Sequence, residues 1–322
     1  MLENLHYKLF SGKNSRLIYN IRCYVRRVIP KFLLKMCLKS RLAQLEKRSD
    51  KDYILQRVDY YNRLQRGSIL PNDAPRLAAH RLAWPSVYFH DTYEFTRWFP
   101  QHYQWGYCPG DVTYVPDYPS IVKSRPLGID NKNSVIMKLN KVRHFLFVDD
   151  KIAFADKKDM VIFRGEINGK PRREMFMNMY YGSPMCNLGE VSNRPIYSHW
   201  HSPKMTIRDH LDYKFIMSLE GNDVASNLKW VMSSNSIAVM PRPTCETWFM
   251  EETLIPNYHY IEIKSDYSDL EERLNYYIEH QDEALKIIEN AHRYVEQFKD
   301  KKRENLISLL VLDKYFKMTG QS

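Results

Sequence analysis

The stretch from residue 210 to residue 298 constrains the fold most strongly, because apolar runs of strand length alternate there with segments of helical periodicity. Such alternation is typical of βα units stacked on a parallel sheet, so it predicts an α/β fold. The predicted elements are a strand at 213–219, a helix at 225–233, a strand at 236–240, a short helix at 247–253, a strand at 259–263 and a helix carrying Leu270, Leu274 and Ile278.

A turn at residues 220–223 follows the first predicted strand, and its Gly221 and Asn222 accept backbone angles that most residues avoid. Ligands of parallel sheets bind beyond the carboxyl ends of the strands, where helix N-termini present N–H groups to phosphate. This indicates a site for a nucleotide or nucleotide sugar, although periodicity alone also fits a doubly wound sheet that binds another phosphate compound. The chain has no GxGxxG and no Walker GxxxxGKS or GxxxxGKT motif, which argues against dinucleotide and P-loop chemistry.

Three segments of the second half, EGNDVASNLKWVMSSNS, ETWFMEE and IPNYHYIEIKSDYSDLEE, resemble glycosyltransferase family 90. They are most similar to its bacterial branch, whose members transfer sugars to the lipopolysaccharide core. Upstream, VPDYPSIV at 115–122 is similar to the family's DYP segment. FRG at 163–165, with Arg172, Arg173 and Glu174 beyond it, is similar to the family's FRG and Arg-acid pair. The resemblance covers residues 114–298.

The resemblance implies a GT-B-like fold, in which two Rossmann-like domains face a cleft, and an inverting, metal-independent transfer from a nucleotide sugar. A chain of 322 residues is long enough for two such domains. We expect a basic amphipathic helical segment at 1–50, an N-terminal acceptor-binding domain at 51–155 and a C-terminal nucleotide-sugar-binding domain at 156–298. A C-terminal helix at 299–322 could cross back to the first domain.

Asp117, in the DYP segment, is the candidate catalytic base, because an inverting transferase needs a carboxylate that takes a proton from the acceptor hydroxyl. A β-rich run at 112–115 precedes Asp117 and suggests a strand end that opens into a loop. Without the resemblance, the same Asp would more simply be a turn residue. Catalytic groups often lie on such loops, so we expect Asp117 to be accessible.

Candidate phosphate ligands follow from the need to hold a departing diphosphate. Arg164 ends a β-type run and precedes Gly165, which would let a ligand approach the backbone closely; a surface ion pair is the alternative for Arg164. Arg173 could hold phosphate or acceptor, with Glu174 orienting it, or belong to a solvated charge cluster.

The resemblance places further donor-binding residues in and after the turn at 220–223, namely Gly221, Asn222, Asp223, Ser226 and Lys229. Many relatives carry an Arg two positions before the matching Lys, whereas this chain has Asn227. This departure leaves open whether the helix offers a cation to the diphosphate or only its N–H groups and the Ser226 hydroxyl. Glu246 or Glu251 could bind ribose hydroxyls, and the neighbouring Trp248 and Phe249 are expected to be core residues.

No residue set has the spacing of a metal site, so we expect no metal and no cofactor beyond the UDP-sugar donor. The pairs Asp149-Asp150 and Asp209-His210 lack the Asp-x-Asp arrangement of metal-dependent transferases. His199-Trp200-His201 has no third ligand at zinc spacing.

Almost all of the net charge lies in the first 50 residues, which hold twelve Lys and Arg against three Asp and Glu, a net of +9 out of +10 for the chain. Leu, Ile, Val and Phe interleave with these cations, which is typical of a helix lying in an anionic membrane interface. The alternative is a solvated cationic face packed on the N-terminal domain. Nucleic acid is a weaker alternative, because the rest of the chain has no basic stripe.

Charges interrupt every apolar run before the length that a bilayer requires, and the first 50 residues lack the features of a secretory signal. Five scattered cysteines predict free thiols in a reducing cytoplasm. We therefore expect a cytoplasmic, peripheral protein of the inner face of a bacterial cytoplasmic membrane.

The predicted function is hexose transfer from a UDP-sugar to a lipopolysaccharide or lipooligosaccharide core, a lipid-linked oligosaccharide acceptor. Alternatives are a glycosyltransferase that acts on a protein or capsule acceptor, and a non-catalytic nucleotide- or carbohydrate-binding protein of the same fold. Asp117 and Arg164 argue against the non-catalytic alternative, and the lack of a secretory signal argues against a protein acceptor.

Overall fold

A computed structural model describes residues 11–322, and these divide into two compact units that each combine separate stretches of chain. Unit 1 comprises residues 11–14, Arg143–Pro243 and Thr253–Gln297. Unit 2 comprises Ser15–Val142, Thr244–Glu252 and Phe298–Ser322. The chain therefore passes between the units more than once.

These units differ from the predicted domains in three places. The change from unit 2 to unit 1 lies between Val142 and Arg143, rather than between residues 155 and 156, and Thr244–Glu252 belongs to unit 2. Residues 15–50 are part of unit 2 rather than a separate segment, while residues 1–10 of the predicted segment lie outside the described residues. The C-terminal residues from Phe298 also belong to unit 2.

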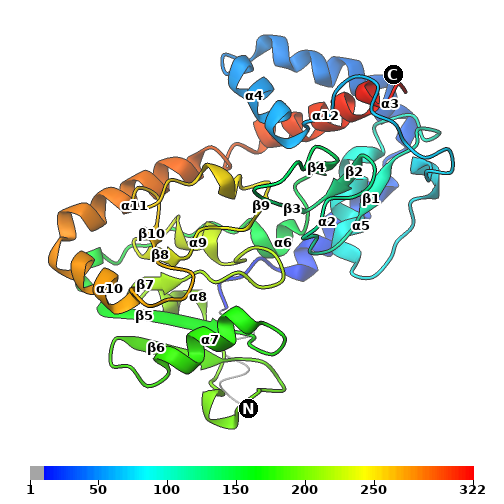
Figure 1. Cartoon of the computed structure of the whole chain (residues 1–322). Coiled ribbons are helices and arrows are strands. Elements are labelled where there is room, and N and C mark those ends of the chain that lie inside the picture. The colour runs from blue at the N-terminus through cyan, green and yellow to red at the C-terminus, as the bar shows by residue number, and fades with distance from the viewer. Residues whose placement is uncertain (1–10) are drawn as a thin grey trace. The chain divides into compact units, whose positions relative to one another are not determined.

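Unit 1 contains a five-stranded parallel sheet with the order β10-β8-β7-β5-β6 (Figure 1). Its strands are β5 (Lys158–Gly165), β6 (Cys186–Glu190), β7 (Tyr213–Met217), β8 (Ile237–Met240) and β10 (Ile261–Glu262). Its helices include α7 (Pro171–Tyr180), α8 (Ile207–His210), α9 (Leu228–Val231), α10 (Leu270–Glu279) and α11 (Gln281–Glu296). The predicted α/β class with a parallel sheet is confirmed.

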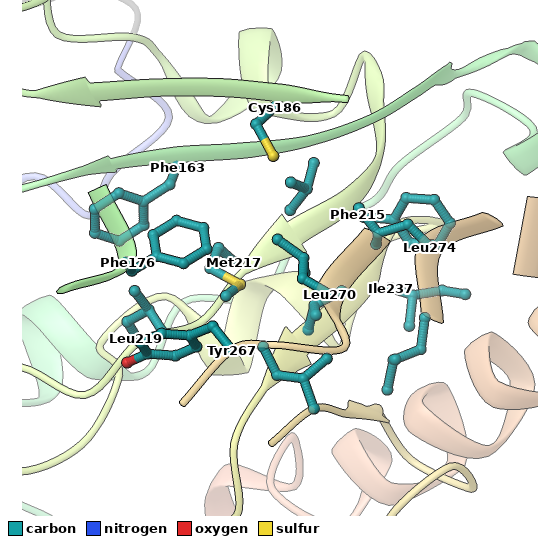
Figure 2. Close-up of a cluster of buried hydrophobic side chains, with 14 of the residues drawn as sticks. Phe163, Phe176, Cys186, Phe215, Met217, Leu219, Ile237, Tyr267, Leu270 and Leu274 are labelled. Carbon is teal, nitrogen blue, oxygen red and sulfur yellow. The ribbon is translucent and has the colours of Figure 1, made fainter. Parts of the chain in front are cut away.

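The core of unit 1 forms on one face of this sheet, because alternate strand residues point to the same side. Phe163, Phe215 and Met217 from the strands pack with Phe176 of α7 and Leu270 of α10 in one buried cluster (Figure 2). Most of the strand residues that face this cluster are nearly inaccessible to solvent. The apolar runs of the sequence are thus buried strands of a sheet covered by helices.

The three predicted strands of this region correspond to β7, β8 and β10, and the last predicted helix corresponds to α10. The helix predicted at 225–233 is limited to α9 (Leu228–Val231). The helix predicted at 247–253 was wrong, because Cys245–Thr247 is a strand, β9, and only Glu251–Thr253 forms a 3-10 turn. Trp248 and Phe249 drive this difference, since both rings are fully buried in unit 2, where Trp248 stacks on Tyr61.

Unit 2 combines five long helices with two small sheets. The helices are α2 (Arg16–Val28), α3 (Lys31–Leu42), α4 (Lys51–Tyr61), α5 (Ser86–Thr96) and α12 (Lys301–Met318). Strands β1 (Gly106–Cys108), β2 (Ser120–Val122) and β4 (Ser134–Ile136) pair in parallel, while β3 (Ser124–Pro126) pairs antiparallel with β9. Helix α12 packs on α4 (Figure 1).

Candidate functional site

The strand order of unit 1 has a switch point between β5 and β7. From β5 the chain moves outward to β6, and it then returns to the other side of β5 to form β7 and the remaining strands. The loops after β5 and β7 therefore leave the carboxyl ends of these strands in opposite directions, and doubly wound sheets bind their ligands at such a point. A predicted donor-binding residue of unit 1 should therefore lie near this switch point.

Arg173 joins the two loops of the switch point. Its Nη1 donates to the main-chain oxygen of Glu166, after β5, at 2.9 Å. Its Nε and Nη2 donate to the main-chain oxygens of Glu220 and Leu219, after β7, at 3.0 and 2.9 Å. Three carbonyl groups thus orient this guanidinium, a role that the sequence analysis had given to Glu174.

The Arg173 guanidinium carries a positive charge in a partly buried position. Burial, with a further contribution from the nearby Arg143, lowers the pKa of Arg173 to about 10. Its hydrogen bonds to the three carbonyls use three of the five N–H groups of a guanidinium, and these acceptors are neutral. An anion at the switch point would complete the hydrogen bonding and offset the cost of burying this charge.

Two glycines leave space around the guanidinium. A β-carbon on Gly221 would lie 3.1 Å from Arg173 Nη2, and one on Gly165 would lie 3.3 Å from Nη1. The Gly165 β-carbon would also lie 2.6 Å from a ring carbon of Phe163. Both predicted glycines therefore allow the backbone to approach Arg173 closely, which no other residue would permit without rearrangement.

Further cations surround this point. Lys170 donates to the Asn222 side chain, and Arg172 forms an ion pair with Glu220 at 3.0 Å. Helix α7 begins here, with Pro171 in its first turn, and among the described residues no side chain caps it. A helix start of this kind is suited to anions. The contact of Lys170 with Asn222 and the proximity of Arg143 to Arg173 depend on the folded loops, so the sequence did not indicate them.

Arg164 lies at the end of β5 but turns toward β6 rather than across the switch point. Its Nη1 donates to the main-chain oxygen of Asn187 and its Nη2 to the Asn187 side chain, at 2.9 and 2.7 Å. Burial lowers the pKa of Arg164, and its Nε has no hydrogen-bond partner among residues 11–322. Gly189 makes room for it, since a β-carbon there would lie 3.1 Å from this Nε. A role of Arg164 in phosphate binding stays a prediction.

The remaining predicted residues in and after the loop that follows β7 are less accessible to solvent. Asp223 is buried, Lys229 of α9 is completely inaccessible to solvent, and Ser226 is partly buried. Asn227 occupies the position where relatives carry an Arg, and its side chain donates to the main-chain oxygen of Met217 at 3.0 Å. This bond fastens the loop to the end of β7, so Asn227 has a structural role that needs no charge.

Asp117 lies in unit 2, in an exposed position of the loop between β1 and β2. The β-rich run at 112–115 that precedes it forms no strand, so the expected strand end before Asp117 was wrong. Instead, Asp117 comes just before β2 and thus near the amino end of that strand. The run fails as a strand because Val112 bonds through both main-chain groups to the Ser124 hydroxyl, at 3.1 and 2.8 Å, rather than to a neighbouring strand.

The loop that carries Asp117 is held on both sides. The Asn133 side chain donates to the main-chain oxygen of Asp117 at 3.0 Å, and the Tyr315 hydroxyl donates to that of Pro119 at 2.8 Å. A β-carbon on Gly106 would collide with Pro119, so the loop can lie against β1 only because residue 106 is glycine. The carboxylate thus projects from a firmly anchored loop.

Glu246 and Glu251 lie in unit 2 rather than in the unit with the five-stranded sheet. Glu246 is completely buried, pairs with Arg125 at 2.7 Å and accepts a short hydrogen bond from the Tyr60 hydroxyl. Glu251 accepts bonds from the main-chain nitrogen and the hydroxyl of Thr247 at 2.6 and 2.8 Å. Both carboxylates are thus occupied in buried contacts, and the sequence pattern could not distinguish this from ribose binding.

The carboxylates weighed as metal ligands make local contacts. Asp150 pairs with Lys157 at 2.8 Å, and Asp149 pairs with Lys151 at 2.6 Å. Asp209 accepts from the main-chain nitrogen of Thr206 at 2.7 Å in the capping box of α8. Each of these acids therefore has a structural partner.

Comparison with known proteins agrees with the motifs. The family model "Glycosyl transferase family 90" matches residues 116–319, a range that includes Asp117, Arg164 and Arg173. The chain is also similar to a protein named O-glucosyltransferase LpsA from Dichelobacter nodosus. The two are 38% identical over 265 residues, which cover 82% of this chain and 83% of that protein.

Proposed function

Since the chain belongs to glycosyltransferase family 90 and is a glycosyltransferase, we propose that it moves a hexose from a UDP-sugar to a lipopolysaccharide or lipooligosaccharide core. Glucose is the proposed hexose, because the similar protein from Dichelobacter nodosus is named an O-glucosyltransferase. The name LpsA and the resemblance to the bacterial branch support the core acceptor.

The proposal includes a GT-B arrangement with the donor in unit 1. Each unit carries its own parallel sheet, which is consistent with two α/β domains. The observation that carries the donor assignment is Arg173, a partly buried guanidinium held by carbonyls at the switch point of the larger sheet. The UDP diphosphate is an anion of suitable size and charge for this place.

The reaction that we propose is a direct displacement with inversion at the anomeric carbon. The Asp117 carboxylate takes the proton of the acceptor hydroxyl, the hydroxyl oxygen bonds to the anomeric carbon, and the bond from that carbon to the UDP oxygen breaks. Arg173, Lys170 and the start of α7 would stabilise the negative charge that develops on the departing diphosphate. These groups supply the positive charge that a divalent ion supplies elsewhere, so the proposed transfer needs no metal.

We further propose that the enzyme works at the inner face of the cytoplasmic membrane, where a lipid-linked core acceptor would lie. The support is the charge distribution, with a net of +9 in the first 50 residues of a chain whose total is +10. An anionic surface attracts such a segment. Among residues 11–322, no helix combines the length and the apolar content needed to cross a membrane.

The proposal is tested by incubating the full-length protein with UDP-glucose labelled in the sugar and a lipopolysaccharide core truncated before its outer hexoses, with and without EDTA. We expect labelled core in both cases, with a β-linkage by nuclear magnetic resonance because the donor is an α-glucoside. A transfer that stops in EDTA and returns with Mn²⁺ would contradict the metal-free mechanism. Label that enters a co-purified protein but not the core would contradict the acceptor.

A further inference from the structure

Helix α2 turns its polar face toward the rest of unit 2. The Tyr19 hydroxyl donates to Asp91 of α5 at 2.8 Å, and Arg26 pairs with Glu94 of the same helix at 2.8 Å. Cys23, which lies one helical turn from each, is the buried residue of α2. The contacts that attach α2 to the unit are thus mostly polar or ionic.

The apolar stripe of α2 points away from the unit. Its members recur three and four residues apart, as the residues of one helix face do, and they remain exposed. The exposed fractions are 70% for Leu17, 53% for Ile21, 61% for Val25 and 81% for Val28. An ordinary surface helix of a globular protein has the opposite orientation, with its apolar stripe on the core.

The exposed apolar surface continues into α3. Ile29, in the short connection, is 43% exposed, and Phe32 and Met36, one turn apart on α3, are 63% and 75% exposed. Trp84, which precedes α5, is 91% exposed. Isolated apolar residues on a surface need no explanation, but a stripe that extends over two consecutive helices marks an interaction site.

Basic side chains flank this stripe. Arg22 and Arg27 of α2 and Lys35 and Lys39 of α3 are exposed, while neither helix carries an acidic residue. An apolar stripe bordered only by cations complements a surface that is apolar inside and anionic outside. A second copy of this chain would instead bring like charges together.

We propose that the exposed face of α2 and α3 inserts into the headgroup region of an anionic lipid bilayer. Leu17, Ile21, Val25, Val28, Phe32 and Met36 form the inserted surface, and the flanking Arg and Lys side chains contact lipid phosphates. The polar contacts of Tyr19 and Arg26 hold α2 on α5 while its apolar side faces the lipid. This inference rests on the proposed function in that it identifies the element through which the enzyme would meet a lipid-linked acceptor.

The test is co-sedimentation of the full-length protein with vesicles of phosphatidylcholine alone and of phosphatidylcholine with phosphatidylglycerol, at low and high salt. We expect binding to the anionic vesicles that weakens as salt screens the charges. Val25→Glu should weaken this binding about tenfold or more, since it places a charge where an apolar side chain would be buried. Leu285→Glu is the matched control, because Leu285 is an exposed apolar residue of α11 and the change in net charge is the same.

A second pair of variants separates the charges from the apolar contact. Arg22→Gln should weaken binding to anionic vesicles, whereas Lys286→Gln, an equal charge change on α11, should not. Calorimetry with UDP on the same samples should give one affinity for all variants, which separates this inference from the proposed function. Vesicle binding that is absent in the full-length protein, or equal for Val25→Glu and Leu285→Glu, would overturn it. If the full-length protein does not bind vesicles but forms a dimer that Val25→Glu dissociates, the exposed face binds a second copy of the chain instead.

Discussion

The two units each contain a parallel sheet and buried apolar residues, but unit 2 also has a network of buried ion pairs. In unit 1, strands of largely apolar residues are covered by helices, and the core is a continuous apolar cluster (Figure 2). In unit 2 the parallel strands are only three residues long, and buried ion pairs link separate stretches of chain. An apolar core of contiguous βα units leaves a pattern in the sequence, whereas an ionic network does not.

Glu304 is at the centre of the unit 2 network. Its carboxylate pairs with Arg57 at 2.6 Å and with Lys138 at 2.9 Å, and it accepts from the Trp248 indole nitrogen at 2.6 Å. Glu304 and its three partners come from four distant parts of the chain. Despite burial, the two nearby cations hold the pKa of Glu304 below its ordinary value, so the carboxylate is ionised.

The largest effect is therefore expected for Glu304→Gln, which keeps the shape of the side chain but removes its charge. Arg57 and Lys138 would stay buried without this carboxylate, and the free energy of unfolding should fall by about 3 to 5 kcal/mol. Urea denaturation measures the change. Glu289→Gln is the control, since it removes an exposed pair with Arg293, and should change stability by about 0.5 kcal/mol or less. A loss for Glu304→Gln as small as that of the control would show that the network does not stabilise unit 2.

A smaller effect is expected at the switch point of unit 1. Arg173→Ala should weaken UDP binding by roughly 10- to 100-fold, the range for losing charge-assisted hydrogen bonds. Arg293→Ala is the matched control, because Arg293 of α11 is 65% exposed and paired with Glu289. Calorimetry with UDP gives both values. Equal UDP affinities for the two variants would show that Arg173 does not bind the diphosphate.

The smallest effect concerns the ionic contacts at the edge of unit 2. Hydrogen bonds from Arg48, and a further one from Arg303, lower the pKa of Asp50 from 3.8 to about 2. Because the folded pKa lies below the unfolded value, Asp50 contributes stability above pH 4, and this contribution is lost as the pH falls toward 2.

Asp50→Asn should therefore lower the free energy of unfolding by about 1 kcal/mol at neutral pH, a figure reduced for solvent screening. The difference from the unmodified protein should shrink as the pH falls through the same window. Urea denaturation at several pH values measures it, with Asp282→Asn, in an exposed pair with Lys286, as the control. A difference that does not change with pH would rule out the ionic explanation.

The contrast between the units also explains what the sequence could predict. The apolar runs of unit 1 correctly predicted the strands now seen as β7, β8 and β10, because strand burial depends on neighbouring residues. The segment at 247–253 was assigned wrongly, since its conformation depends on the burial of Trp248 and on bonds between Glu251 and Thr247. Those partners belong to a unit assembled from distant stretches.

The candidate site likewise contains some residues that the sequence predicted and others that it did not. Arg173 and Gly221 were predicted from motifs, and the strand order places both at the switch point. Arg143 was missed because only the folded chain brings it near Arg173, and Lys170 was missed because only the folded loops bring it to Asn222. The DYP motif predicted Asp117 as the acid. It could not predict Asn133 and Tyr315, which anchor the loop of Asp117 and lie far from it in the sequence.

The central claim is that unit 1 binds the donor and Asp117 of unit 2 provides the base. It is tested most directly by measuring UDP affinity and the turnover of UDP-glucose with the core acceptor for Asp117→Asn. The account predicts that UDP affinity is unchanged and that kcat falls by roughly 100-fold or more, because only the proton acceptor is lost. Near-normal turnover, or a loss of UDP affinity equal to that of Arg173→Ala, would contradict it.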